Sequence, residues 1–205
     1  PLWNALKANV LYRRLEFDRT QDVHDRQRFV AYLQLPRNAN YVRREYLQKR
    51  DFQDVIVDLA AGVPELSAEL GQQIGDDERL VRAYLHHFLV DVQGHADFAP
   101  FLEEAYAKEV LAEANILAGT GDQERWHAML APPQLRALTE RVAIELLPTC
   151  KKRFRVEELV KLNVAIQNVD SLVVQVYEIS TFNYYRAKEA AVGTSVDLAG
   201  LVPSR

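Results

Sequence analysis

The chain has 205 residues, 48% of them hydrophobic, and its 25 Lys and Arg side chains against 29 Asp and Glu side chains give a formal net charge of -4. That is enough apolar material for a packed core, in one large domain or two small ones. The charges are mixed, which argues against nucleic-acid binding, and no apolar run has the length of a transmembrane segment. We therefore expect the partner to be a protein or a neighbouring domain of the same chain, and the localisation stays open.

Apolar residues recur with helical spacing through the first two thirds of the chain and predict a succession of helices. The predicted helices span residues 2–17, 25–35, 41–50, 52–61, 64 to either 71 or 75, 76–94, 97–118, 122–130 and 132–140. The buried face of the first is formed by Leu2, Leu6, Leu15 and either Val10 or Leu11. For 52–61 a strand is the alternative, because three consecutive residues there are β-branched.

The ends of several helices are marked by residues that suit a cap. Asp25, Asp76, Asp97 and Asp122 each precede a helical run, where a carboxylate accepts hydrogen bonds from unpaired backbone N–H groups. Asp76 is followed by two more acids and a sustained apolar stripe ending at Gly94, which predicts a central helix of the core. Gly119 is expected to end the helix that Asp97 begins, since glycine is favoured just past a helix.

Near residue 142 the apolar residues change from helical spacing to alternation, which is typical of strands. Strands are predicted at 142–147, 160–166, 172–179, 182–186 and 195–198. The connection 167–170 contains Asn and Asp, so the second and third strands are expected to form an antiparallel hairpin. So few strands do not close a sandwich, and we expect the natural polypeptide to continue beyond this chain.

The predicted fold class is therefore α+β, with an N-terminal helical array followed by a small antiparallel β region in the form of a partial sandwich. We place the helical domain at 1–141 and the β segment at 142–205.

The run from 164 to 179 carries a strand, an Asn-Val turn and a second strand, with the sequence VAIQNVDSLVVQVYEI. It resembles the macroglobulin-type β-sandwich domains of large bacterial alpha-2-macroglobulin-like proteins, and also uncharacterised multidomain bacterial and plant proteins in which helices precede such a sandwich. The resemblance implies a modular role in a long chain and protein recognition at the cell envelope. It implies no thioester chemistry, because Cys150 is followed by Lys-Lys-Arg and not by Gly-Glu-Gln.

The sequence predicts no catalytic residue, no cofactor and no resident metal. The one constellation that would support a metal site is His87, Asp91 and His95, spaced four residues apart along one helical flank. Gly94 weakens that interpretation, because it interrupts the helix before His95. Histidines near the C-terminal end of a helix also favour the negative end of its dipole without any metal.

Two further groups of residues suggest other chemistry. Cys150, the single cysteine, would need His24 or His127 as a base to act as a nucleophile, but no flanking signature accompanies it, and packing is the simpler interpretation. An aromatic cluster in the β region has the composition to stack a ligand or to fill a core, and consists of Tyr177, Phe182, Tyr184 and Tyr185.

We conclude from the sequence that the chain is a non-enzymatic structural or protein-interaction segment of a larger multidomain protein. Two alternatives stay open. One is a metal-dependent enzyme that uses the two histidines and the aspartate. The other is an α-helical repeat module that binds peptides, which requires a groove lined by exposed aromatic residues such as Tyr41, Tyr46 and Trp126.

Overall fold

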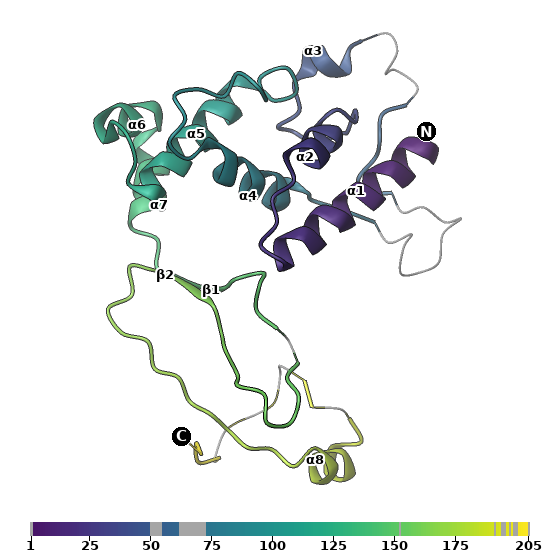
Figure 1. The fold of residues 1–205 in the computed structure, drawn as a ribbon, viewed down its shortest axis with the longest axis vertical. Helices are drawn as coiled ribbons and strands as arrows, with labels where there is room; N and C mark the ends of the chain where they lie inside the picture. Colours follow the sequence, from purple (N-terminus) through teal and green to yellow (C-terminus); the bar gives the residue numbers. More distant parts are fainter. Residues whose placement is uncertain are drawn as a thin grey trace. The chain divides into compact units, whose positions relative to one another are not determined.

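The computed structural model describes residues 2–49, 55–61, 73–151, 153–190, 192, 193, 196, 198 and 201–204. Within them the chain is α+β, mostly helical with one small antiparallel sheet, so the predicted fold class is confirmed (Figure 1). The elements are α1 (Leu2–Thr20), α2 (Arg26–Leu33), α3 (Arg44–Leu47), α4 (Glu78–Leu89), α5 (Glu104–Ala118), α6 (Gln123–Met129), α7 (Pro132–Thr139), β1 (Ala143–Leu146), β2 (Val164–Gln167) and α8 (Thr181–Lys188).

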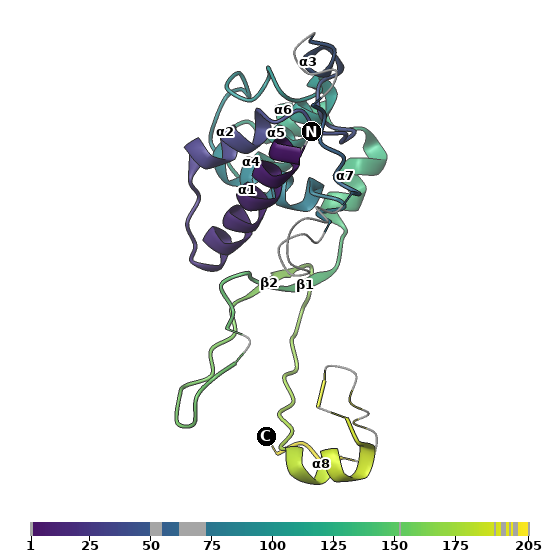
Figure 2. The same ribbon diagram turned by 90° about the vertical axis from the view of Figure 1, so that its right-hand side faces the viewer.

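The chain divides into two compact units, 1–167 and 168–205. The first holds α1 to α7 and both strands, and the second holds α8. In the first unit α1 packs beside α2, α4 along α5, and α5 against α6 (Figures 1 and 2). None of the described helices combines the length and the apolar character needed to cross a bilayer.

Three of the predicted helix ends are confirmed. The Asp25 carboxylate accepts a hydrogen bond from the Arg28 backbone N–H at 2.9 Å, and Asp122 accepts one from the Arg125 N–H at 3.2 Å. Gly119 follows α5 with φ 64°, in the left-handed region that glycine adopts without steric cost. These ends are fixed by local chemistry, which is why the sequence alone indicates them.

The core of the first unit is rich in stacked rings. Phe29 of α2 lies 5.0 Å from the ring of Tyr84 in α4 and meets Phe98 edge-on at 5.7 Å, measured between ring centroids. Ala8 and Leu15 of α1 are fully buried beside them. These contacts join three helices through apolar surface, the dominant favourable term in folding.

The structure decides which face of α1 is buried. Leu11 packs against the core together with Ala8 and Leu15, whereas 58% of Val10 is exposed. Of the two residues between which the sequence pattern did not choose, Leu11 therefore belongs to the buried face. The outer face of this helix keeps apolar side chains of its own.

Both α4 and α5 are shorter than predicted. The first ends at Leu89 and not at Gly94, because Asp91 has φ 58° and its backbone N–H donates to the Asn115 side chain at 2.9 Å. The second begins at Glu104 and not at Asp97. Leu102 forms an antiparallel bridge with residue 42, so the backbone before α5 pairs across the fold and does not wind into a helix.

The region between α2 and α4 also differs from the prediction. Of the helix predicted over 41–50, only the four residues of α3 are helical, and residue 50 lies outside the described residues. The helix predicted over 52–61 is wrong for 55–61, where Val57 forms a parallel bridge with Arg37. Its β-branched side chain suits this extended pairing. Residues 52–54 and the helix predicted from 64 lie outside the described residues, except for 73–75, which are not helical.

The predicted hairpin between 160–166 and 172–179 is wrong. β2 pairs with β1 in the register Ala143 to Gln167 and Leu146 to Val164, so the partner precedes β2 in the chain. Asn168 follows β2 with φ 51°, a left-handed conformation that takes the chain out of the ladder. Residues 172–179 are not assigned to a strand.

The strand predicted over 182–186 is a helix, α8. The Ser180 hydroxyl caps it by accepting a hydrogen bond from the Asn183 N–H at 3.3 Å. A serine cap thus outweighs the β propensity of the aromatic residues that follow it. Of the strand predicted over 195–198, positions 195 and 197 lie outside the described residues, and 196 and 198 are not in a strand.

A buried polar cluster joins α2 and the segment after it to the start of α4. We call it the Arg37 cluster, and it consists of Arg37, Asp77, Tyr32 and Tyr41. The hydroxyls of Tyr32 and Tyr41 each donate to the Asp77 carboxylate at 2.6 Å. Arg37 Nη1 donates to the Tyr32 carbonyl at 2.5 Å, and its Nε lies 3.5 Å from Asp77 Oδ2. Its guanidinium carbon lies 4.1 Å from the centroid of the Tyr32 ring.

Burial decides the protonation states in this cluster. It raises the pKa of Tyr32 and of Tyr41 against the opposing charge of Arg37, so both phenols stay protonated and donate to Asp77. Arg37 and Asp77 are 0% and 1% exposed, so water does not replace a lost partner. Breaking such a pair on one side leaves a buried charge uncompensated.

We predict that Asp77→Asn lowers the free energy of unfolding by about 3 to 5 kcal/mol, because Arg37 then keeps its charge without a counterion. Asp97→Asn is the matched control: Asp97 pairs with Arg26 at the surface, where both side chains are more than half exposed, and its loss is expected to cost under about 1 kcal/mol. Urea unfolding of both variants measures the difference. Equal costs would show that the buried pair does not hold the fold.

Candidate protein-interaction site

The structure does not bring His87, Asp91 and His95 together as a metal site. His87 stacks on His24 with ring centroids 3.8 Å apart, and Asp91 lies beyond the end of α4. The His95 carbonyl accepts a hydrogen bond from Phe98 in a separate turn. Among the described residues, no group of three or more His, Cys, Asp or Glu side chains is arranged to hold a metal ion. That the whole chain carries no metal stays a prediction.

The stacked rings of His24 and His87 pack at the edge of the hydrophobic core. Burial lowers the pKa of His24, and the nearby charge of a protonated His87 lowers it further. His24 also meets the ring of Tyr84 edge-on, with centroids 5.3 Å apart. The neutral imidazole therefore serves as an aromatic side chain that joins the segment before α2 to α4.

Cys150 is engaged by a neighbouring backbone and not by a histidine. Its thiol donates to the Asn163 carbonyl at 3.1 Å, and its sulfur accepts from the Asn163 N–H at 3.0 Å. The described structure places neither His24 nor His127 at hydrogen-bond distance from it. These two hydrogen bonds join the segment after β1 to the segment before β2. They do not form a nucleophile–base pair.

The aromatic residues predicted to line a peptide groove are buried, so this prediction is wrong. Tyr41, Tyr46 and Trp126 are only 4%, 6% and 1% exposed. The Tyr46 hydroxyl donates to the Gln34 carbonyl at 2.6 Å, and Trp126 Nε1 donates to the Thr120 carbonyl at 3.0 Å. Their polar atoms are used inside the fold and are not available to a ligand.

The aromatic cluster predicted near the C-terminus lies in the second unit. Phe182 and Tyr185, on α8, are 69% and 61% exposed, while Tyr177 and Tyr184 are half-buried. α8 therefore presents two of these rings to solvent. Whether the cluster binds a ligand stays a prediction.

A hollow of about 430 Å³ opens near His24, lined by Arg19, Asp22, His24, Ala83, Leu147, Pro148, Thr149 and Asn163. Three of its polar side chains are engaged with protein partners. Asn163 Nδ2 donates to the Thr149 hydroxyl at 3.1 Å, and Arg19 pairs with Glu16 at 3.4 Å. The hollow therefore does not present a set of convergent free donors of the kind that orients a small molecule.

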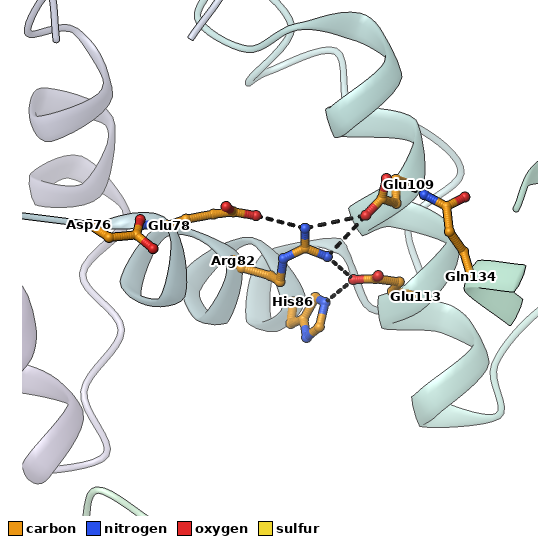
Figure 3. Close-up of polar contacts among 7 residues, drawn as sticks. All are labelled: Asp76, Glu78, Arg82, His86, Glu109, Glu113 and Gln134. Carbon is orange, nitrogen blue, oxygen red and sulfur yellow. Dashed lines mark hydrogen bonds and ion pairs between the residues drawn. The ribbon is translucent and has the colours of Figure 1, made fainter. Parts of the chain in front are cut away.

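The densest group of charges lies between α4 and α5, and we call it the Arg82 cluster (Figure 3). Arg82 reaches Glu113 at 2.5 Å, Glu78 at 2.8 Å and Glu109 at 3.3 Å. His86, one turn further along α4, lies 3.2 Å from the same oxygen of Glu113. Residues of two helices thus share one guanidinium, and the cluster fixes how α4 lies along α5.

The electrostatics of the Arg82 cluster favour an ionised Glu113. Burial raises the pKa of this carboxyl, but the hydrogen bond from His86 and the charge of Arg82 outweigh it, so the net pKa is lowered. Gln134 of α7 donates to Glu109 at 2.8 Å and connects a third helix (Figure 3). The cluster holds no nucleophile, and its donors and acceptors serve each other.

Sequence analysis missed Asn115, which joins the same two helices from inside the core. This side chain is fully buried, and its amide nitrogen donates to the carbonyls of Leu89 and Leu111 at 2.9 and 2.8 Å. Its oxygen accepts from Asp91 N–H and from the Thr120 hydroxyl. The sequence does place an Asn on the apolar face of the helix predicted over 97–118. Because a buried polar side chain needs hydrogen-bond partners, this position could have been predicted to join α5 to its neighbours.

An exposed stripe runs along α1, and we call it the α1 outer face: Trp3, Lys7, Val10, Arg14 and Phe17. The spacing alternates between four and three residues, so these positions share one side of the helix. Trp3, Val10 and Phe17 are 79%, 58% and 53% exposed. A surface helix normally turns polar residues to solvent, and this stripe is the part of α1 best suited to contact another molecule.

We predict that Glu113→Gln lowers stability in a pH-dependent way. Because the folded-state pKa of Glu113 lies below its unfolded value of about 4.3, the carboxylate adds stability above that pH, and this contribution disappears as the pH falls toward the folded pKa. The variant should be less stable than the parent near neutral pH and converge with it in acid. Urea unfolding at a series of pH values tests this, with exposed Glu124→Gln as control. A constant difference at every pH would contradict it.

Comparison with known proteins identifies the chain by family. The model of the Actin-binding protein F N-terminal domain matches residues 1–142, and the model of the AbpF first immunoglobulin-like domain matches 172–205. Actin-binding protein F of Dictyostelium discoideum is 28% identical over 204 residues, which is 98% of this chain and 8% of that protein. The chain therefore spans less than a tenth of the length of this relative. No solved structure matches.

These matches overturn the macroglobulin resemblance. The strand-like pattern of 164–179 is shared by many sandwich domains, and the part from 172 onward matches an immunoglobulin-like domain instead. The helical part, which the macroglobulin resemblance did not cover, matches a family along its whole length. The chain belongs to the family of the Actin-binding protein F N-terminal domain.

Proposed function

We propose that this chain is a non-enzymatic, actin-binding recognition segment of a larger protein. The observation that carries the proposal is the similarity to Actin-binding protein F over 98% of the chain, together with the family match over 1–142. The name of that relative attributes actin binding to the protein as a whole. The proposal assigns an actin contact to this segment.

The side-chain chemistry supports a binding role over a catalytic one. The groups that would act as nucleophile or base, Cys150 and His24, are engaged in structural contacts. The charged side chains of the Arg37 cluster and of the Arg82 cluster are paired with other members of the same cluster. Apolar side chains are exposed on α1, and exposed apolar patches mark protein contacts.

The purified chain is expected to pellet with actin filaments in a saturable manner, with a dissociation constant on the order of micromolar, the strength of a transient contact. Co-sedimentation over a range of filament concentrations measures it, and the chain spun without filaments is the control. If the chain stays in the supernatant at filament concentrations well above that range, the proposal is wrong.

We also propose that 1–141 is a helical domain that folds as one body, followed by the segment 142–205, of which 142–167 lies in the same compact unit as the helices. In support, many apolar side chains after 141 are exposed, among them Val156 at 94% and Leu159 at 73%, whereas the buried core residues of the described chain lie before 131. A protease cuts backbone that opens without global unfolding.

Brief trypsin digestion followed by mass spectrometry is therefore expected to yield a resistant fragment that ends close to residue 141. First cuts are expected at Lys151, Arg153 and Arg155, because these residues lie outside the helices. Early cuts inside α4 or α5 would contradict the division.

A further inference from the structure

The apolar residues of the α1 outer face lie outside the hydrophobic core. The opposite side of the helix supplies the core contacts through Ala8 and Leu15, which are fully buried. Exposure of Trp3, Val10 and Phe17 leaves large apolar surfaces in water without stabilising the unit. Burying them against another molecule would remove that surface from solvent.

The stripe has the composition of a protein contact. Trp3 and Phe17 are large aromatic anchors of the kind that carry most of the energy of an interface. The three apolar residues are spaced seven positions apart. The basic residues Lys7 and Arg14 lie between them. Arg14 lies over the ring of Phe17, with its guanidinium carbon 5.4 Å from the ring centroid, and its Nε pairs with Asp18 at 3.3 Å. Both contacts hold Arg14 along the stripe.

The two basic residues of the α1 outer face indicate which kind of partner can bind there. Two copies of the chain meeting along this face antiparallel would place Lys7 opposite Arg14, and in a parallel pair each basic residue would meet its own copy. Like charges in direct opposition destabilise a contact. A complementary partner instead presents carboxylates that match Lys7 and Arg14 and apolar recesses that receive the three apolar side chains.

We propose that the α1 outer face is the surface through which this chain contacts actin, by meeting an acidic, apolar-pocketed patch on the filament. This inference rests on the proposed function and adds the site to it. Figure 2 shows α1 in front of the other labelled helices of its unit, and the exposed fractions of Trp3, Val10 and Phe17 leave the stripe open to a partner.

The test is co-sedimentation with actin filaments of two variants of the whole chain. The apolar variant carries Trp3→Ser, Val10→Ser and Phe17→Ser, and the charge variant carries Lys7→Glu and Arg14→Gln. We expect affinity to fall by about tenfold or more for the apolar variant, because it loses its anchors. We expect a several-fold loss for the charge variant, with a weaker dependence on salt than in the parent.

Matched controls come from other helices. Leu117→Ser changes an apolar residue of α5 that is 50% exposed, and Arg79→Glu reverses a basic side chain of α4 that is 85% exposed. Both are expected to bind as the parent does. Thermal unfolding confirms that each variant keeps the fold, since all the substituted side chains are exposed.

The outcomes separate the two proposals. If the parent binds filaments and both variants bind equally well, the α1 site is wrong and the proposed function stands. If the parent does not bind filaments, both fail. Two further results would also overturn the site: parent dimers that the apolar variant abolishes in sedimentation velocity, or binding of the parent to phosphatidylserine vesicles with none to actin.

Discussion

The structure of the first unit depends on a buried ion pair, that of Arg37 and Asp77. Burying these two charges is costly, and hydrogen bonds from neighbouring groups offset part of the cost, although Arg37 Nε makes no hydrogen bond within the described structure. Two tyrosine hydroxyls donate to the carboxylate, and a backbone carbonyl accepts from the guanidinium. The ion pair therefore selects one specific arrangement of the chain and adds little net folding free energy.

That arrangement brings together segments that are remote in sequence. Tyr32 and Asp77 are 45 residues apart, and the pair joins the end of α2 to the start of α4. The segment between α2 and α4 is also held by the bridge between Arg37 and Val57. In the same segment, residue 42 forms a bridge with Leu102. The Arg82 cluster and Asn115 then fix α4 along α5.

Local features of the fold were predictable from sequence, and remote ones were not. Asp25, Asp122 and Gly119 end helices through contacts with residues only a few positions away, so the local sequence reveals them. The partner of β2 is β1, on the far side of the segment 147–163, and alternation alone favoured the nearer residues 172–179. Likewise, nothing near Asp77 indicates that its counterion is Arg37.

The candidate site shows the same limit. Sequence predicted a helix for α1 but could not separate its two apolar faces, because Val10 and Leu11 are adjacent and both fit a helical stripe. Only packing shows that Leu11 faces the core and Val10 faces solvent. An apolar residue that the fold leaves outside is then the most informative one for function, since folding does not explain it.

The measurement that tests this account most directly is electron cryomicroscopy of actin filaments decorated with the whole chain. We expect the helical array to be bound with the length of α1 against the filament and with Trp3, Val10 and Phe17 buried in the contact. A map in which α1 faces solvent while another surface touches actin would contradict it.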